Sequence, residues 1–318
     1  MTKKIYLAGG CFWGMEAYFS KIRGVISTQV GYANGITNET SYYQIKNTDH
    51  AETVEIEYNP NVINLAEILE RFLLLVNPYS INKQGNDIGR QYRSGIYYVD
   101  DYSRKCALLT LEIYEKQHDN KKTVIEVQEL RNFIVAEENH QRYLEKHPGG
   151  YCHINLSNLS VPLSKFKKLQ INEIDKLGLD ELSKSVMLEK ATERPFTSYL
   201  NDEKSIGLFV DKISKEALFI SDDKFDSGCG WPSFTKGITT DSISYNQDLS
   251  HNMNRIETTS RIQDSHLGHV FEDGPRARGG LRYCINGAAL DFIPVDKLKN
   301  SVYENYLPYF QSEVEKHQ

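Results

Sequence analysis

Apolar and polar residues follow two different rhythms along the first half of the chain. Alternation with a period of two predicts strands, whereas apolar residues spaced three or four apart predict helices. The predicted strands are residues 3–8, 53–60, 93–99 and 123–127, and the predicted helices are residues 14–22, 64–76, 103–119 and 136–148. Asn64 and Ser103 are the expected helix caps. This order predicts a two-layer α/β sandwich related to the split βαβ arrangement.

The pattern changes after Cys152, where residues 153–180 carry Ser, Asn and Lys and show no clean strand period. A helical stretch over residues 181–193 follows. Short apolar segments separated by turn residues then predict a mostly-β domain of packed antiparallel sheets. These segments are residues 206–210, 217–221, 237–240, 242–247, 254–264, 269–273 and 281–286. The chain is therefore predicted to be an α+β protein with a domain at residues 1–155, a linker at 156–178 and a second domain at 179–318.

Composition adds limits on the partners. A length of 318 residues fits two domains, and a net charge of −6 argues against nucleic-acid binding, which needs a basic patch. The longest apolar run, residues 72–76, is far shorter than the ~20 residues of a membrane-spanning helix. Residues 1–10 lack the apolar core of a signal peptide. We expect a cytoplasmic protein without a membrane or nucleic-acid partner.

Five cysteines are the main candidates for chemistry. They are Cys11, Cys106, Cys152, Cys229 and Cys284. An odd and sparse set is not a secreted disulfide framework, and no C-x-x-C pair supports a thioredoxin-like or zinc-ribbon interpretation. Each thiol is therefore an inert core residue or a reactive group, according to its surroundings. Cys106 lies within the apolar pattern of residues 103–119 and is expected to be a core residue.

Cys11 stands in the sequence GGCFWG, between a predicted strand and a predicted helix. At a helix N-terminus the backbone N–H groups and the helix dipole favour a thiolate, so we expect a lowered pKa. Phe12 and Trp13 would line an apolar pocket beside the sulfur. The same pattern also fits a small buried side chain in a core, because free cysteine is often buried.

Cys152 follows two glycines in HPGGYCHI (147–154), a segment that we expect to be mobile. A mobile second thiol suits a resolving role, in which it closes a disulfide on an oxidised Cys11. Four further motifs, TDHAE (48–52), SYY (41–43), NDIGRQYRSGIYY (86–98) and AEENHQRYLEKHP (136–148), bring carboxyl, phenol and guanidinium groups to the same half.

GGCFWG, HAE (50–52), D-x-G-x-QYRS-x-IY (87–97) and AEE-x-HQ-x-YL-x-K-x-P (136–148) have the order and spacing found in the peptide methionine-S-sulfoxide reductases, and residues 4–154 resemble that family. The resemblance implies that Phe12 and Trp13 hold the methyl group of the sulfoxide while the Cys11 thiolate attacks its sulfur. It also implies that Glu52 donates a proton to the oxygen, which requires a pKa raised by an apolar environment.

Three more residues of this half are implied by the resemblance. Tyr42 and Tyr92 would hydrogen-bond the sulfoxide oxygen, and Asp87 would orient water or a neighbouring side chain, unless it is an ordinary turn residue. The segment QIKNTDHAE (44–52) is shorter than in relatives, so Tyr43 is an alternative to Tyr42. We favour Tyr42.

Four segments of the second half resemble the peptide methionine-R-sulfoxide reductases. They are ERPFTSYL (193–200), KFDSGCGWPSF (224–234), DSHLGHVFEDGP (264–275) and GGLRYCINGAAL (279–290). The resemblance implies that Cys284 is the nucleophile and Cys229 the resolving thiol. The other residues that it implies at the site are the methyl-binding Trp231, the proton-handling His266 and His269, the thiolate-stabilising Arg282, and the nearby Asp273 and Asn286.

A metal site built from the cysteines and histidines of this half is an alternative interpretation. The spacing lacks the C-x-x-C pairs of structural zinc sites. Zinc-binding members of the family carry two such pairs, whereas the corresponding positions here are Asp211, Ser214, Ser260 and Gln263. We therefore expect no zinc.

A sulfoxide sulfur is a stereocentre, and a pocket that fits one hand would bury an unpaired oxygen of the other. The resemblance thus implies two sites that reduce the two epimers of methionine sulfoxide in oxidised proteins. No G-x-G-x-x-G fingerprint for a flavin or nicotinamide is present, so no bound cofactor is expected. Thioredoxin is the external dithiol that the resemblance implies.

Two other functions remain open on the residues alone. Cys11 with His50 or His140 would make a thiol hydrolase or acyltransferase, although Cys152 and Cys229 would then have no role. A binding module with degenerate sulfoxide sites is the second alternative.

Overall fold

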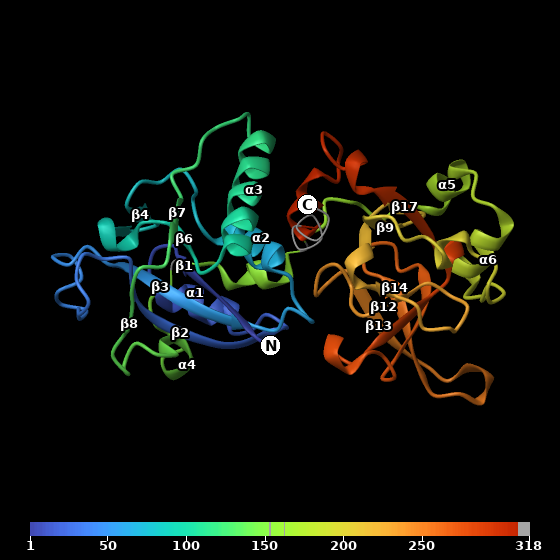
Figure 1. Ribbon diagram of the computed structural model, residues 1–318, viewed down its shortest axis with the longest axis horizontal. Helices are drawn as coiled ribbons and strands as arrows, with labels where there is room; N and C mark the ends of the chain where they lie inside the picture. Colours follow the sequence, from blue (N-terminus) through green and yellow to red (C-terminus); the bar gives the residue numbers. More distant parts are fainter. Residues whose placement is uncertain (153, 162, 311–318) are drawn as a thin grey trace. The chain divides into compact units, whose positions relative to one another are not determined.

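The computed structural model describes residues 1–152, 154–161 and 163–310, and the chain divides into two compact units, Met1–Val161 and Pro162–Gln318 (Figure 1). The first unit mixes helices and strands, and the second is mostly β with antiparallel sheets. The predicted α+β class is confirmed. Residues 311–318 of the predicted second domain lie outside the described residues.

The first unit is built on a six-stranded sheet. Its strands, in spatial order, are β7 (Glu126–Glu129), β6 (Gly95–Tyr98), β1 (Lys3–Ala8), β3 (Ala51–Tyr58), β2 (Val25–Ala33) and β8 (Phe133–Val135). Neighbours are antiparallel except β6 and β7, which are parallel and need a crossover connection. A helix between them supplies it. The short strands β4 (Lys83–Gln84) and β5 (Asp87–Ile88) form a separate hairpin.

Three of the helices of this unit correspond to predicted helical patterns. They are α1 (Phe12–Phe19), α2 (Leu65–Leu75) and α3 (Asp101–Gln117). Asn64 is the N-cap residue of α2, as expected. In α3 the cap is Asp100 rather than Ser103, because the Asp100 carboxylate accepts the Ser103 N–H at 2.7 Å while the Ser103 hydroxyl accepts the Asp100 N–H.

The predicted helix over residues 136–148 is wrong for most of its length, because only α4 (Tyr143–Lys146) is helical. Two features prevent a helix over the earlier part of this segment. Arg142 lies in the left-handed region with φ 50°. The Gln141 side chain accepts the Val30 N–H at 3.0 Å and donates to the Val30 oxygen at 2.9 Å, so this segment is bound to β2.

The second unit contains two sheets. One has the order β10 (Ala217–Ile220), β9 (Gly207–Asp211) and β17 (Leu290–Pro294). The other has the order β11 (Lys224–Phe225), β12 (Ser233–Phe234), β16 (Arg282–Ile285), β15 (His266–Phe271), β14 (Arg255–Ser260) and β13 (Ile243–Asp248). The helices α5 (Ile171–Ile174) and α6 (Glu181–Glu189) precede these strands.

Aromatic side chains join the two sheets of this unit. Phe219 of β10 stacks on Phe234 of β12 with ring centroids 4.3 Å apart, and Phe209 of β9 meets Phe234 edge-on at 4.9 Å. All three are fully buried. Burial of such large apolar side chains supplies most of the driving force for a core of this kind.

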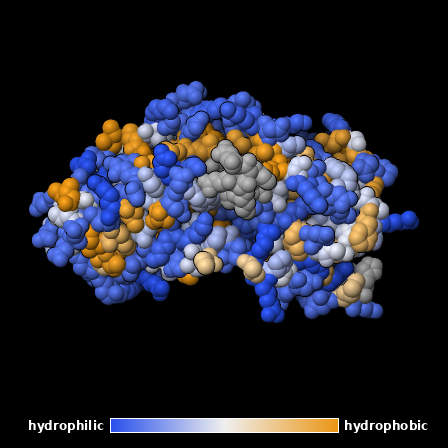
Figure 2. Space-filling view, viewed as in Figure 1, coloured by the Kyte–Doolittle hydropathy of each residue, from blue (hydrophilic) through white to orange (hydrophobic). Residues whose placement is uncertain are grey.

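Parts of the predicted linker, residues 156–178, have contacts of their own. The Asn158 side chain donates to the Leu74 oxygen in the first unit. In the second unit the Gln263 amide accepts the Leu169 N–H at 2.8 Å and donates to the Leu169 oxygen at 3.2 Å. Hydrophilic residues cover much of the face shown in Figure 2, with apolar residues in separate groups. In the described part of the chain, no helix has the length and apolar character needed to cross a membrane.

Candidate active sites

Cys11 is the N-cap residue of α1, directly after the central strand β1. The next residue, Phe12, donates its backbone N–H to the Glu52 carboxylate at 3.1 Å. Glu52 comes from β3, the neighbour of β1, and is 2 % exposed. The fold therefore brings a buried carboxyl group to the helix end at which the thiol lies.

Glu52 is a candidate proton donor at neutral pH. Burial raises its pKa to about 8, against the opposing hydrogen bond from Phe12 and with a further rise from the charge of Asp87. A neutral carboxylic acid in an apolar environment can donate a proton, which an ionised one cannot.

Cys11 does not have the lowered pKa that its position at a helix N-terminus predicts. It is 6 % exposed, and burial raises its pKa, with a further rise from Glu52. Desolvation of the thiolate therefore outweighs the helix end. The raised pKa favours the protonated thiol over the thiolate.

Phe12 and Trp13 form the aromatic wall of this site. Trp13 stacks on Tyr143 of α4 with centroids 3.7 Å apart, and its indole N–H donates to His140 Nδ1 at 3.3 Å. His140 also packs against Phe12 at 5.5 Å. The sequence indicated a structural rather than a catalytic part for His140, and the stacking of Tyr143 was not anticipated, because the segment that contains both folds back from far along the chain.

A cavity of about 480 Å³ brings Glu52 together with Tyr42, Tyr92 and Asp87. Burial raises the pKa of Tyr42, and the neighbouring Tyr92 hydroxyl acts in the opposite direction. Tyr43 also lines the cavity but is 93 % exposed. This geometry favours Tyr42 over Tyr43 as a group that contacts a ligand.

Glu137 fixes the position of Tyr42 and was not anticipated. One oxygen of its carboxylate accepts the Tyr42 backbone N–H at 3.0 Å, and the other accepts the Tyr32 hydroxyl at 2.6 Å. Asp87 accepts a hydrogen bond from the Tyr151 hydroxyl at 3.2 Å. Tyr151 directly precedes Cys152, so this contact ties the segment of the second thiol to the cavity.

Cys152 lies beside the first turn of α1. Its Sγ would be 2.9 Å from a Cβ placed on Gly14, three residues after Cys11. The thiol donates to the Ile154 oxygen at 3.2 Å and is partly exposed. By contrast, Cys106 is fully buried in α3. The contact explains why residue 14 is a glycine, because any side chain there would displace the Cys152 sulfur.

In the second unit, the predicted site forms a row across four strands. Ser233 of β12 pairs with Cys284 of β16, Cys284 pairs with His269 of β15, and His269 pairs with Glu257 of β14. Directly paired residues share one face of a sheet, with Cβ atoms roughly 4.5–5.5 Å apart. The register therefore places a thiol, an imidazole and a carboxylate side by side.

Each of the two histidines has a carboxylate partner. His269 Nε2 lies 2.7 Å from Asp248 Oδ2, and His266 Nδ1 lies 2.7 Å from Glu257 Oε1. Lys190 at the end of α6 donates to the other Glu257 oxygen at 2.8 Å. Carboxylates in such positions fix the tautomer and orientation of an imidazole. Sequence reasoning missed both, because the strand register was not visible in the sequence.

The two thiols of this unit are in contact, with Cys229 Sγ 3.4 Å from Cys284 Sγ. The hydroxyls of Ser227 and Ser233 lie 3.0 Å and 3.4 Å from Cys229 Sγ. Although burial acts against it, these hydrogen bonds lower the pKa of Cys229 to about 7. Burial, together with the neighbouring Cys229, raises the pKa of Cys284 to about 12. The two thiols therefore titrate as a coupled pair in which the thiolate is favoured at Cys229.

Arg282 shares a strand face with Cys284, but two of its guanidinium nitrogens donate to the Asp273 carboxylate. Asp273 accepts from Nε and Nη2, each at 2.8 Å, and the guanidinium carbon lies 4.5 Å from the centroid of the Phe271 ring. Asp273 thus orients Arg282 instead of facing the thiols. Arg282 lowers the pKa of Cys284, but burial outweighs it.

Asn286 is buried, and both ends of its amide contact the backbone. Its oxygen accepts the Glu193 N–H at 3.0 Å, and its nitrogen donates to the Leu267 oxygen at 3.0 Å. Trp231 likewise donates its indole N–H to the Glu193 oxygen at 3.1 Å. Both predicted residues are therefore held by one residue, Glu193.

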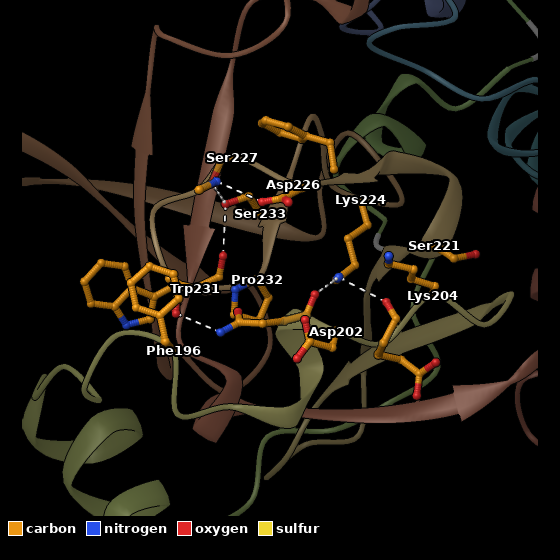
Figure 3. A pocket seen from close by; sticks show the side chains of 15 residues that line it. Phe196, Asp202, Lys204, Ser221, Lys224, Asp226, Ser227, Trp231, Pro232 and Ser233 are labelled. Atoms are coloured by element: carbon orange, nitrogen blue, oxygen red, sulfur yellow. Dashed lines mark hydrogen bonds between the residues drawn. The ribbon is translucent and has the colours of Figure 1, made fainter.

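A second cavity of about 430 Å³ lies against the turn that carries Cys229 (Figure 3). Trp231, Phe196, Ser227 and Ser233 line it, and Lys224 extends along it, with its ammonium donating to the oxygens of residues 201 and 203. Cys284 and the histidines do not belong to its lining.

The positions where zinc-binding relatives carry cysteines hold no thiol in this chain. Asp211 accepts the N–H groups of Ile213 and Ser214, and the Gln263 amide is bound to the backbone of Leu169. A carboxylate, two hydroxyls and an amide lack the thiolate and imidazole ligands of structural zinc. Among the described residues, no group of three or more metal-binding side chains is assembled. The expectation of no zinc stays a prediction.

Comparison with known proteins gives two family matches. The model of the peptide methionine sulfoxide reductase family matches residues 3–171, more than half of the chain, and the model of the SelR domain matches residues 179–294. The two matches do not overlap, and each covers the residues of one of the two candidate sites.

Several solved structures are similar to the first half. Mxr1 from Saccharomyces cerevisiae in reduced form is 36 % identical, with a TM-score of 0.46, over 48 % of this chain and 91 % of that one. Methionine sulfoxide reductase A of Corynebacterium diphtheriae is 34 % identical, with a TM-score of 0.45, over 48 % and 77 %. Mxr1 in complex with Trx2 is 29 % identical, with a TM-score of 0.33, over 44 % and 84 %.

Two family matches on one chain account for two separate thiol centres, since each epimer of the sulfoxide is reduced by its own type of enzyme. The chain belongs to the peptide methionine sulfoxide reductase family, and it reduces the S epimer of methionine sulfoxide with its first unit and the R epimer with its second.

Proposed function

We propose that each unit works through a sulfenic acid, an intramolecular disulfide and recycling by thioredoxin, with Cys11 and Cys284 as nucleophiles and Cys152 and Cys229 as resolving thiols. The observation that carries this proposal is the 3.4 Å contact between the sulfurs of Cys229 and Cys284. Two free thiols in contact can close a disulfide with little movement of the chain.

In the first unit, the sulfoxide methyl group packs against the aromatic wall, and its oxygen lies in the cavity with Tyr42 and Tyr92. Glu52 gives its proton to that oxygen and takes the proton that Cys11 loses, so the charge of the buried site stays constant. The Cys11 sulfur attacks the polarised sulfoxide sulfur. The oxygen passes to Cys11 as a sulfenic acid, and methionine leaves.

In the second unit, Cys284 attacks in the same way. Trp231 holds the methyl group, and His269, directly paired with Cys284 across the strands, passes a proton to the oxygen. His266 lies behind it, with ring centroids 5.6 Å apart. Arg282, positioned by Asp273, favours the thiolate form of Cys284.

Resolution is the same reaction at both centres. The thiolate of the resolving cysteine attacks the sulfenic sulfur, a disulfide forms, and the hydroxyl leaves as water with one proton. The two thiols of thioredoxin then reduce that disulfide and become a disulfide themselves. Cys152 is partly exposed whereas Cys11 is buried, so an external dithiol reaches Cys152 first in the first unit. In the second unit Cys229 and Cys284 are both partly exposed.

Serine substitutions of the resolving thiols should separate reduction of the sulfoxide from recycling by thioredoxin. Cys152→Ser should release about one methionine per protein from the S epimer and then stop when thioredoxin is the reductant, because a sulfenic acid without its partner forms no disulfide. Cys229→Ser should do the same with the R epimer. Counting methionine per protein by rapid quench checks both.

In each variant the other epimer is the internal control and should turn over normally. Mass spectrometry of the wild type after one turnover should show Cys11–Cys152 and Cys229–Cys284 disulfides. Continued thioredoxin turnover of the matching epimer by either variant would contradict the recycling scheme, even though reduction itself would stand.

The hydroxyls around Cys229 give a pH test of its resolving role. In the double variant Ser227→Ala, Ser233→Ala, the pKa of Cys229 should rise from about 7 towards its ordinary value. Disulfide closure at pH 7 should then slow roughly fivefold to tenfold, because the smaller thiolate fraction is only partly offset by a more nucleophilic sulfur. Single-turnover loss of free thiols after addition of the R epimer measures the rate.

At pH 10 both proteins have an ionised thiol, so the variant should close its disulfide at least as fast as the wild type. A rate difference that is the same at pH 7 and pH 10 would show that the hydroxyls do not act on the ionisation of Cys229.

A further inference from the structure

Glu193 uses all of its polar atoms within the second unit. Its carboxylate accepts the N–H groups of Gly287 and Ala288, the latter at 2.8 Å. Its backbone N–H donates to the Asn286 amide at 3.0 Å, and its backbone oxygen accepts the Trp231 indole at 3.1 Å. The residue is 3 % exposed.

These four contacts join the two sides of the R-epimer site. Residues 286–288 follow directly on β16, the strand that carries Cys284, so the carboxylate anchors the end of that strand. Trp231 lies on the other side, on the turn that carries Cys229. The Glu193 backbone therefore spans from the strand of the nucleophile to the ring proposed to hold the methyl group.

The segment after Glu193 strengthens the same connection. The Phe196 N–H donates to the Gly230 oxygen at 2.7 Å, and the Asn201 side chain donates to the same oxygen at 2.9 Å. Gly230 stands between Cys229 and Trp231 and has a φ of +92°. The turn is thus held on one side by residues 196–201 and through the indole by Glu193.

We propose that Glu193 is a positioning residue for the R epimer: through its carboxylate it fixes its own backbone, and through that backbone it sets the angle of the Trp231 indole relative to Cys284. This inference rests on the proposed role of Trp231. Binding of the sulfoxide methyl group needs the ring at one angle. The hydrogen bonds of Glu193 go to residues 286–288 and to Trp231 and not to Cys284 itself, so we expect the larger effect on binding and a small one on the attack of Cys284.

Glu193→Gln is the main test, because it keeps the shape of the side chain but presents an NH₂ group to one of two backbone N–H donors. We expect the KM for the R epimer to rise about tenfold, while kcat for the R epimer and both parameters for the S epimer stay within twofold. Glu193→Asp, which keeps the charge but is one methylene shorter, should raise KM in the same direction. Glu189→Gln, the same change at the exposed end of α6, is the matched control and should alter nothing.

Fluorescence provides a second readout, because the chain has two tryptophans, Trp13 and Trp231. In a Trp13→Phe background, emission comes from Trp231 alone. Glu193→Gln should shift that emission to longer wavelength, whereas Glu189→Gln should not. Loss of an indole hydrogen bond and of a fixed ring position would cause the shift.

The outcomes separate this inference from the proposed function. If Trp231→Phe leaves the KM for the R epimer unchanged, the methyl-binding role of Trp231 is wrong. If Trp231→Phe raises KM but both Glu193 variants leave KM and emission unchanged, the positioning role is wrong. A fall in kcat and in thermal midpoint without a change in KM would show a purely structural role and would also overturn the proposal.

Discussion

Replacing Cys11 by serine should abolish reduction of the S epimer of methionine sulfoxide and leave reduction of the R epimer at its normal rate. A serine hydroxyl cannot act as the nucleophile, because the thiolate of cysteine is the species that attacks. The two thiol centres belong to separate units with separate cores, so the loss of one nucleophile has no path to the other. An assay with the two separated epimers and dithiothreitol measures both rates.

Cys284→Ser is the reciprocal variant and should remove only the R-epimer activity. The two serine proteins are controls for each other, since each should retain one full activity and thereby prove that it is folded. If either substitution removed both activities, the assignment of one nucleophile to each epimer would be wrong.

Replacing Glu52 by glutamine should lower kcat for the S epimer by about 10²–10⁴-fold, the usual contribution of a positioned proton donor. The wild type should also lose S-epimer activity as the pH rises through about 8. Burial raises the Glu52 pKa to that value, so the carboxyl carries its proton below pH 8 and is ionised above it. A pH profile of kcat for the S epimer checks the sign.

The glutamine variant should lack this alkaline decline, because an amide does not titrate. R-epimer reduction by the same protein serves as the control and should be unaffected by Glu52→Gln at any pH. A wild-type profile for the S epimer that stays flat between pH 7 and 9 would rule out Glu52 as the acid.

The sequence was most informative where function is contained in short contiguous motifs. In GGCFWG, the strand before the motif and the helix after it place Cys11 at a helix end, and the structure has this arrangement. Periodicity found β1, β3, α2 and α3, because each is a regular element with a buried face. It failed for residues 136–148, where the Gln141 side chain replaces a backbone partner of β2.

The pKa of the Cys11 thiol was harder to predict from the sequence than its place in the fold. A helix end predicts a reactive thiol at residue 11, but the depth of burial and the nearby Glu52 carboxyl reverse the direction of the pKa shift. Burial of one side chain depends on elements from all over the unit. A short stretch of sequence does not contain that information, so the pKa of Cys11 could not be predicted from the residues next to it in the chain.

The hydrogen-bond partners of the two histidines on neighbouring strands could not be predicted from the sequence either. His266, His269 and Cys284 are recognisable in their motifs, whereas Asp248 and Glu257 stand in an ordinary alternating segment. They become partners of the histidines only through the pairing of β13, β14 and β15. A shift of one residue in either pairing would have produced the same motifs without the site.

The row from Ser233 through Cys284 and His269 to Glu257 therefore limits how this unit can change during evolution. Insertion of one residue within any of its strands would turn every later side chain of that strand to the opposite face and dismantle the site. The connecting residues 249–254 and 274–281 carry no such register constraint, whereas Asp273 must stay within reach of Arg282. Length variation among descendants of this chain should accumulate in those loops, and engineered insertions should be tolerated there first.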